Sequence, residues 1–303
     1  MNYHTPVLLT ESIEGLNVRP DGVYVDATLG GGGHTRAIVE RLTTGRLISL
    51  DQDADALANA PDDERLIAQR GNFRYLQNYL AHHDYRQVDG ILADLGVASF
   101  HFDDVERGFS FRYNDAPLDM RMNAAAQLTA KAVLNHYPES KLADIFAIYG
   151  EVPNAARVAR QVVAARRTAA IVNSGQLIEA IGQCIPRGAE NKYLAKVYQS
   201  LRIEVNNELE NLKSLLQQSV NLLAAGGRLV VIAYHSLEDR LVKNFFKNGM
   251  FEGEAEKDLY GNVNVPFRQA NSKAIVPTEA ETIANSRSRS AKMRIGIRTN
   301  YNK

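Results

Sequence analysis

The stretch that decides the fold is residues 22–34, Gly-Val-Tyr-Val-Asp-Ala-Thr-Leu-Gly-Gly-Gly-Gly-His. A short β-branched run ends at Asp26, and four glycines, Gly30 to Gly33, precede the start of a helical pattern. A strand that turns sharply into a helix gathers unpaired backbone N–H groups, and glycines let a ligand approach them. The stretch therefore predicts a site for a nucleotide-like cofactor, without saying which one.

Apolar runs rich in β-branched residues recur around this stretch, and helical patterns separate them. The runs lie at 23–28, 46–51, 65–70 and 88–94, and the helical patterns at 35–42, 54–60 and 73–82. This alternation predicts an α/β fold, a Rossmann-like, doubly wound and mostly parallel sheet covered on both faces. A fifth run of the same kind, 228–235, comes much later, and the spacing of leucines predicts one helix over 203–224 leading into it. Residues 290–298 predict a last edge strand.

The long gap before the fifth strand predicts an inserted domain. It is far longer than an ordinary crossover, and helical patterns fill it at 131–137, 140–149, 155–166 and 174–181. We expect a core of residues 1–104 and 203–303 and a mainly helical insert of 105–202. Residues 125–202 carry ten Lys/Arg and five Asp/Glu in a chain of zero net charge. An RNA-binding face is one interpretation and a merely solvated face is the other, the latter being favoured for the single basic helix at 155–166.

Composition excludes several classes of protein. The chain of 303 residues has one cysteine, Cys184, so it has no internal disulfide and no multi-cysteine zinc site. It contains no long apolar run, which predicts a cytoplasmic protein without a membrane span. Its seven histidines show no metalloprotease spacing, and we expect no metal. The last basic residues, from Arg287 to Arg298, fit an RNA-contacting arm and a solubilising tail equally well.

The sequence of the glycine loop limits which class of cofactor we expect. A triphosphate loop needs a lysine after the glycines, but His34 and Thr35 follow here. The dinucleotide pattern Gly-x-Gly-x-x-Gly is not matched cleanly either. Asp51, at the end of the second strand, suits the two hydroxyls of a ribose. The loop and this acid together favour an adenosine cofactor, whereas Asp26 is expected to be structural.

Two further strand ends carry polar side chains. Asp94 ends the fourth strand, and His235 and Ser236 follow the fifth. Because doubly wound folds bind ligands at the carboxyl ends of their strands, we expect these residues to lie together. Ser236 is expected to cap the next helix, with Asp239 three residues on; capping does not explain His235.

These motifs together closely resemble the ribosomal RNA small subunit methyltransferase H family, the MraW-type cytosine-N4 methyltransferases of 16S rRNA. The resemblance runs nearly end to end. Its blocks are 3–9 (YHTPVLL), 26–34 (DATLGGGGH), 94–97 (DLGV), 106–110 (ERGFS), 118–122 (LDMRM), 201–206 (LRIEVN) and 235–240 (HSLEDR). The chain departs from the family at 98–101, where many members read Ser-Ser-Pro-Gln and this chain reads Ala-Ser-Phe-His.

The resemblance implies a class I methyltransferase that uses S-adenosyl-L-methionine. Its substrate would be the N4 amine of a cytidine in the decoding centre of 16S rRNA, in the small ribosomal subunit or a precursor particle. The residues implied to contact the cofactor are Gly31, Gly32, Gly33, His34, Asp51 at the ribose, Phe73 near the adenine, Asp94 and His101. We expect Ser99 and His235 to line the substrate side as candidate catalytic residues. The sequence leaves a homodimer open.

Two other interpretations remain at this point. One is an NAD(P)-dependent oxidoreductase with the same strand–loop–helix arrangement. The spacing of the glycines argues against it. The other is a non-catalytic, RNA-binding ribosome-assembly factor, against which the intact loop, Asp51 and Asp94 argue. Titration with S-adenosylmethionine and with NAD(H) separates the three.

Overall fold

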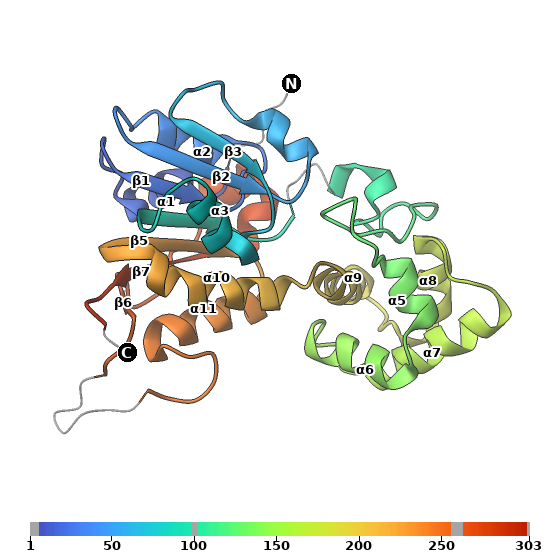
Figure 1. The fold of residues 1–303 in the computed structure, drawn as a ribbon. Helices are drawn as coiled ribbons and strands as arrows, with labels where there is room; N and C mark the ends of the chain where they lie inside the picture. The colour runs from blue at the N-terminus through green and yellow to red at the C-terminus, as the bar shows by residue number, and fades with distance from the viewer. Residues whose placement is uncertain (1–5, 98–101, 256–262, 302–303) are drawn as a thin grey trace. The chain divides into compact units, whose positions relative to one another are not determined.

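The computed structural model describes residues 6–97, 102–255 and 263–301. By its internal contacts the chain divides into two compact units, one of Met1–Gly96 with Leu209–Lys303 and one of Val97–Glu208. The sequence placed the insert at 105–202. The mixed sheet belongs to the first unit, and the helices α5 to α9 belong to the second (Figure 1).

The first unit is built on a seven-stranded sheet in the order β3-β2-β1-β4-β5-β7-β6. The strands are β1 Val23–Asp26, β2 Arg46–Asp51, β3 Leu66–Arg70, β4 Val88–Asp94, β5 Leu223–Ala233, β6 Phe267–Gln269 and β7 Lys292–Arg298. β1 to β5 pair in parallel, and β7 is antiparallel to both β5 and β6. This confirms the predicted α/β sheet.

Helices cover both faces of this sheet. α3 Leu76–His82, α10 Glu208–Leu222 and α11 Ser236–Asn248 pack on one face, and α1 Leu9–Leu16 and α2 Gly33–Val39 pack on the other. Because successive side chains of a strand alternate between faces, Tyr24 joins the α1–α2 core while Val25 joins the opposite core. Two buried apolar layers therefore fix the register of the central strands.

The C-terminal strand was predicted in the right place but in the wrong position in the sheet. β7 is an interior strand, because β6 pairs with its outer side and forms the edge. β6 has three residues and lies in a Gly/Asn/Pro-rich region, so it has no readable alternation. The basic residues of β7 consequently belong to a sheet and do not form a tail.

The predicted single helix over 203–224 is also wrong. α9 Glu190–Asn206 ends at Asn207, which has a φ of 52°, and α10 begins at Glu208. Asparagine tolerates this left-handed conformation better than most residues. The apolar spacing continues across Asn207, so the break is not visible in the pattern of apolar residues. The predicted helix at 54–60 is a 3-10 helix, η1 Asp55–Asn59, and the pattern at 73–82 divides into η2 Phe73–Tyr75 and α3.

The second unit has its own apolar core. Its helices are α5 Ala130–His136, α6 Glu139–Ile148, α7 Ala155–Thr168, α8 Ser174–Ile181 and α9, with the short turns η3 Val105–Arg107 and η4 Gly182–Cys184. The four helices predicted for the insert are confirmed. One buried cluster joins all five helices and includes Cys184, whose thiol is a core group.

Three sequence blocks of the insert hold one another in place. Arg107 Nη2 donates to the carbonyls of Arg121 and Met122, both at 3.0 Å. The Asn206 side chain donates to Met120 O at 2.7 Å and accepts from Met122 N at 2.8 Å. These blocks, ERGFS, LDMRM and LRIEVN, therefore build the insert itself.

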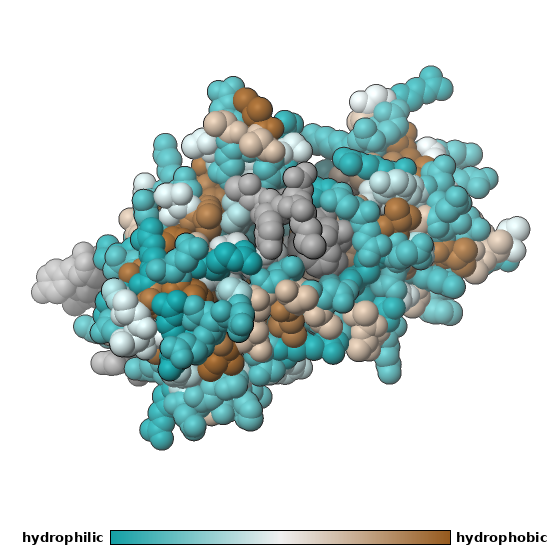
Figure 2. Space-filling view, turned by 90° about the horizontal axis from the view of Figure 1, so that it is seen from above, coloured by the Kyte–Doolittle hydropathy of each residue, from teal (hydrophilic) through white to brown (hydrophobic). Residues whose placement is uncertain are grey.

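The remaining described elements lie near the C-terminus, α12 Glu279–Ala284 and η5 Ser286–Ser290. The face drawn in Figure 2 is mainly hydrophilic, and its hydrophobic residues form small separate groups. In the part of the chain that the structure describes, no helix combines the length and the apolar character needed to cross a membrane.

Candidate cofactor site

Three acids meet at the carboxyl ends of neighbouring strands. Asp26, Asp51 and Asp94 end β1, β2 and β4, and β1 pairs with both of the other strands. Each pKa is raised, mainly by burial, and the charge of Asp51 adds to the effect at Asp26, as that of Asp26 does at Asp94. The fold therefore concentrates negative charge at this edge of the sheet.

The glycine loop lies between β1 and α2 and is tied to Asp51. Gly30 and Gly32 have φ values of 50° and 75°, which favour glycine. The N–H of Gly30 donates to Asp51 Oδ2 at 2.9 Å. A Cβ on Gly31 would meet no atom within 4 Å, so the loop presents its backbone to open space. The helix begins at Gly33, two residues before the predicted start.

Asp51 has acceptor capacity left for a ligand. Its Oδ1 accepts from Asp53 N and its Oδ2 from Gly30 N, each at 2.9 Å. The backbone N–H of Gln52 also contributes a hydrogen bond to this carboxylate. An ionised carboxylate has about four acceptor sites, so these backbone donors do not use all of them.

Asp26 is structural, as the sequence predicts. Its Oδ1 accepts from Thr28 N at 3.1 Å, and its Oδ2 from Thr35 Oγ1 at 2.7 Å. The side chain is fully buried, which raises the pKa to about 7. Asp26 therefore ties the start of the glycine loop to the first turn of α2.

His34 is held inside the core unit. Its Nε2 donates to the carbonyl of Val7 at 3.1 Å, and burial lowers its pKa to about 4. The ring is therefore neutral at pH 7, with Nδ1 as an acceptor. Nδ1 lies 3.8 Å from Asp94 Oδ2, too far for a direct hydrogen bond. His34 thus neighbours the acids without neutralising them.

Asp94 is the acid whose environment points most clearly to a cationic ligand. Its Oδ1 accepts from the hydroxyl of Tyr234 at 2.8 Å, and burial raises its pKa to about 7. Among the described residues, no lysine or arginine pairs with Asp26, Asp51 or Asp94. S-adenosylmethionine carries an ammonium and a sulfonium, and its adenosine carries a ribose. Acids without a cationic partner, two of them partly exposed, beside an open glycine loop therefore fit this cofactor.

Phe73 opens η2 directly after β3. Its side chain is half-buried and packs against the apolar layer that contains α3 and α10. The neighbouring Asn72 caps η2 and donates to Gln52 Oε1 at 2.8 Å, which joins the loops that follow β2 and β3. The place of Phe73 suits the predicted adenine contact, which stays a prediction.

His235, and not Ser236, is the N-cap of α11, so the predicted cap is wrong. The ring Nδ1 of His235 faces Glu238 N at 3.5 Å, and Nε2 lies 3.3 Å from Glu238 Oε1. The helix therefore starts one residue earlier than expected, because an imidazole nitrogen supplies the acceptor. Capping of α11 thus accounts for the hydrogen-bonding role of Nδ1, one of the two ring nitrogens of His235. Its catalytic role stays a prediction.

The structure brings Tyr234 to Asp94, a residue that sequence reasoning missed. β4 and β5 pair with Asp94 opposite Ile232, and Tyr234 follows β5 directly. A tyrosine just before the HSLEDR block was the available signal, but apolar packing explains such a residue equally well. The predicted Ser99 and His101 lie outside the described residues.

Several basic residues of interest have structural partners. Arg294 and Lys292 pair with Asp239, at 2.6 and 3.5 Å, and Arg298 donates to the carbonyl of Val220. In α7, Arg166 donates to the carbonyls of Leu134 and Tyr137 at 2.6 and 2.7 Å. The solvent-exposed arginines of this helix are Arg157, Arg160 and Arg167.

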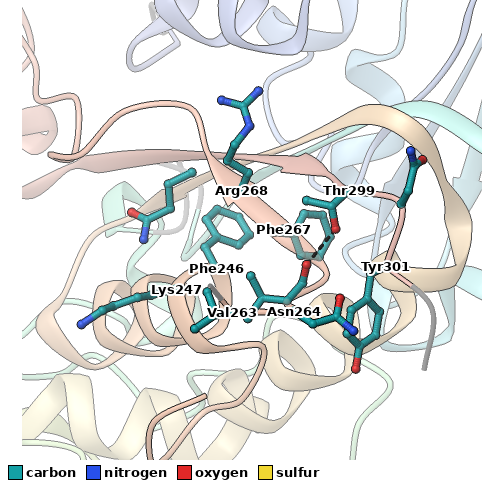
Figure 3. A pocket seen from close by; sticks show the side chains of 11 residues that line it. Phe246, Lys247, Val263, Asn264, Phe267, Arg268, Thr299 and Tyr301 are labelled. Carbon is teal, nitrogen blue, oxygen red and sulfur yellow. Dashed lines mark hydrogen bonds between the residues drawn. The ribbon is translucent and has the colours of Figure 1, made fainter. Parts of the chain in front are cut away.

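A hollow of about 460 Å³ lies at the outer edge of the sheet, beside β6 (Figure 3). Its walls include the rings of Phe246, Phe267 and Tyr301. None of the predicted site residues lines it. The hollow is therefore a different feature from the glycine loop and its acids.

The sheet order, the open glycine loop and the acids at the strand ends define an S-adenosylmethionine-dependent methyltransferase of class I. Residues 1–299 match the MraW methylase family. The chain belongs to this family, which confirms the resemblance seen in the sequence.

Relatives match over nearly their whole length. The ribosomal RNA small subunit methyltransferase H of Bacteroides thetaiotaomicron is 55% identical over 296 residues, 97% of each chain. That of Parabacteroides distasonis is 54% identical over 295 residues, 97% of this chain and 96% of its own. A solved rRNA methylase from Streptococcus thermophilus aligns over 97% of this chain and 93% of its own, at 10% identity and a TM-score of 0.41, a likeness too distant to carry an argument.

Proposed function

We propose that the protein methylates the N4 amine of a cytidine in the decoding centre of 16S rRNA, in the small ribosomal subunit or a precursor of it. The observation that carries the cofactor side is the set of acids at the strand ends, without lysine or arginine partners among the described residues, beside an open glycine loop. The substrate side is supported by the names of the relatives. The site of action is then the cytoplasm.

In this proposal the residues around the glycine loop contact different parts of the cofactor. Asp51 accepts the ribose hydroxyls while it orders the loop through Gly30. Asp94 faces the cationic end of the cofactor, and His34 forms a neutral wall beside it. When bound, S-adenosylmethionine supplies a methyl group on a sulfonium, which is a good leaving group. His101 is proposed to complete the pocket.

The substrate amine needs orientation more than activation by a base. The lone pair of the cytosine N4 amine is delocalised into the ring, so in-line placement is the main contribution that a protein makes. We propose His235 and Ser99 for the substrate side. Nδ1 of His235 caps α11, and Nε2 is a buried atom that lies 3.3 Å from Glu238 Oε1, so the role proposed for His235 is to shape this side of the site.

Mass mapping of modified cytidines in 16S rRNA tests this function directly. Small subunits from cells that lack the protein are expected to lose one N4-methylated cytidine. The wild-type protein with S-adenosylmethionine should restore it in vitro, and Asp94→Asn should need a higher cofactor concentration to do so. If no N4 methylation is lost, the proposed substrate is wrong, even if the protein binds the cofactor.

We propose that the exposed arginines of α7 contact RNA phosphates, and two adjacent residues test this. Arg167→Ala should leave the free energy of unfolding within about 0.5 kcal/mol, because Arg167 is exposed. It should weaken RNA binding and lower the salt dependence by about one phosphate contact.

Arg166→Ala is the matched control for this test. It removes two hydrogen bonds to carbonyls at the end of α5 and should cost about 1–3 kcal/mol of stability. Urea unfolding and filter binding at several salt concentrations measure both variants. An unchanged RNA affinity for Arg167→Ala, also when combined with Arg157→Ala, would show that this helix face is merely solvated.

A further inference from the structure

Tyr234 joins the end of β5 to the acid that faces the cofactor. Its hydroxyl donates to Asp94 Oδ1 at 2.8 Å, and its backbone N–H donates to Glu238 Oε2 at 2.9 Å. Its ring lies beside Gly96, where an added Cβ would be 3.7 Å from Tyr234 Cδ2. The residue therefore contacts two carboxylates, Asp94 through its hydroxyl and Glu238 through its backbone N–H.

The ring belongs to the core, but the hydroxyl serves Asp94. Tyr234 packs against the apolar layer of α1 and α2, and a phenylalanine ring would fill the same space. A buried hydroxyl needs a hydrogen-bond partner, and here the partner is a carboxylate that has no cation. Burial, and after it the charges of Asp94, Glu238 and Glu281, raise the pKa of Tyr234 well above its usual value. The hydroxyl therefore stays protonated and remains a donor.

The other groups around Asp94 do not stabilise its negative charge. Asp26 on β1 and Glu238 at the start of α11 are acids, and they raise the pKa of Asp94 further. His34 on α2 is neutral and turns an acceptor nitrogen toward Asp94. Of the side chains that face Asp94 in the described structure, Tyr234 is the one that donates to it.

We propose that Tyr234 is a positioning residue for cofactor binding, whose hydroxyl keeps Asp94 an oriented carboxylate that meets the cationic end of S-adenosylmethionine. This inference rests on the cofactor role of Asp94 given under the proposed function. It assigns Tyr234 no contact with the reacting atoms.

The consequence is a characteristic dependence of cofactor affinity on pH. Burial raises the pKa of Asp94 to about 7, and the hydrogen bond from Tyr234 works in the opposite direction. A cation binds the ionised form, so affinity for the cofactor should rise with pH until Asp94 has lost its proton. Without the hydroxyl the pKa of Asp94 is higher still, and the same rise should occur at higher pH.

Titration calorimetry with S-adenosylmethionine and S-adenosylhomocysteine on Tyr234→Phe tests this. At pH 7 the affinity should fall about tenfold, because a hydrogen bond to a charged group contributes about 1.5 kcal/mol. The loss should shrink toward about pH 8.5, and kcat at saturating cofactor should change less than KM. An equal loss at every pH, or no loss, would overturn the inference.

Tyr24→Phe is the matched control. Tyr24 is buried in β1 of the same sheet, and its hydroxyl accepts from Arg19 N at 2.7 Å, away from the acids. This substitution should lower the melting temperature without changing the affinity or its pH profile. A loss of cofactor affinity equal to that of Tyr234→Phe would mean that loosening of the core explains both, which would overturn the inference.

A double-mutant cycle with Asp94→Asn separates the inference from the function on which it rests. In the Asp94→Asn background, Tyr234→Phe should have no further effect on cofactor affinity, because no charge remains to be held. If the wild type itself binds no S-adenosylmethionine, the proposed function fails. If the wild type binds and the two substitutions act independently, only the role of Tyr234 fails.

Discussion

The two ends of strand β4 treat their acids in opposite ways. Asp89, near the amino end, pairs with Arg19 at 2.5 Å and also accepts from Val23 N. Asp94, at the carboxyl end, accepts from a tyrosine hydroxyl and lies near two other acids. The two side chains are similarly exposed, 28% and 23%, but among the described residues the protein pairs Asp89 with a cation and gives Asp94 none.

This contrast separates structure from function within one strand. A surface ion pair such as Arg19–Asp89 contributes at most about 1 kcal/mol to stability. A largely desolvated acid without a cation destabilises the fold when it is ionised, so its presence calls for an explanation other than folding. The cofactor role that we propose for Asp94 would supply this explanation, because a cationic ligand completes the pair.

The largest expected effect is that substitution of Asp94 lowers cofactor affinity without lowering stability, whereas substitution of Asp89 lowers stability without lowering cofactor affinity. Asp94→Asn keeps the shape and the acceptor for Tyr234 but removes the charge. It should weaken S-adenosylmethionine binding about 10- to 100-fold, since a hydrogen bond to a charged group contributes about 1.5–3 kcal/mol. It should also leave the ligand-free protein at least as stable at pH 8. Calorimetry and urea unfolding measure both quantities.

Asp89→Asn is the control at the other end of the strand. It should lower the free energy of unfolding by up to about 1 kcal/mol and leave the cofactor affinity unchanged. If both variants lose affinity equally, charge at the carboxyl end has no special role. The distinction between the two ends of β4 would then be broken.

The next largest effect is a difference in stability between substitutions of two neighbouring glycines of the loop. Gly32→Ala places a methyl group against the carbonyl of Asn59, at a φ of 75°, and should cost about 2–3 kcal/mol of stability. Gly31→Ala meets no atom within 4 Å and should leave stability unchanged. Its methyl group enters the open space of the loop, so it should lower cofactor affinity. Equal stability of the two variants would contradict the loop geometry.

The sequence predicted the parts of this site that depend on local order. The glycine run, Asp51 and Asp94 stand at strand ends that apolar patterning makes visible, and the fold follows from the same pattern. Tyr234 could not be predicted, because its contact with Asp94 requires the register that sets Asp94 opposite Ile232 in another part of the chain. The cap at His235 was missed because serine is the more usual N-cap.

Two features of the fold were also predicted wrongly, namely the end of α9 at Asn207 and the edge of the sheet. The break at Asn207 lies inside an unbroken apolar spacing, and only a φ of 52° reveals it. The edge strand β6 is too short to show alternation, so the sequence predicts β7 as the edge. The position of β6 is set by its pairing with β7, which is distant in sequence, and local propensity does not specify it.

The smallest expected effect is the pH dependence of stability in the ligand-free protein, because its contributions oppose one another. Burial raises the pKa values of Asp26 and Asp94 to about 7. Between about pH 4 and 7 the folded state therefore holds more protons on these acids than the unfolded state, and their contribution makes stability fall as pH rises. Burial lowers the pKa of His34 to about 4, so its contribution makes stability rise between about pH 4 and 6.5.

Differences between variants make these opposing slopes visible. Relative to the wild type, Asp94→Asn should gain stability steadily as pH rises from about 4.5 to 7. His34→Gln should lose stability relative to the wild type over the same range. Each group contributes at most about 1.4 kcal/mol per pH unit, and urea unfolding at several pH values measures the differences. Saturating S-adenosylmethionine should reduce the gain of Asp94→Asn, because the bound cation stabilises the wild-type carboxylate. A constant difference at all pH values would mean that Asp94 is already paired within the protein, like Asp89 at the other end of its strand.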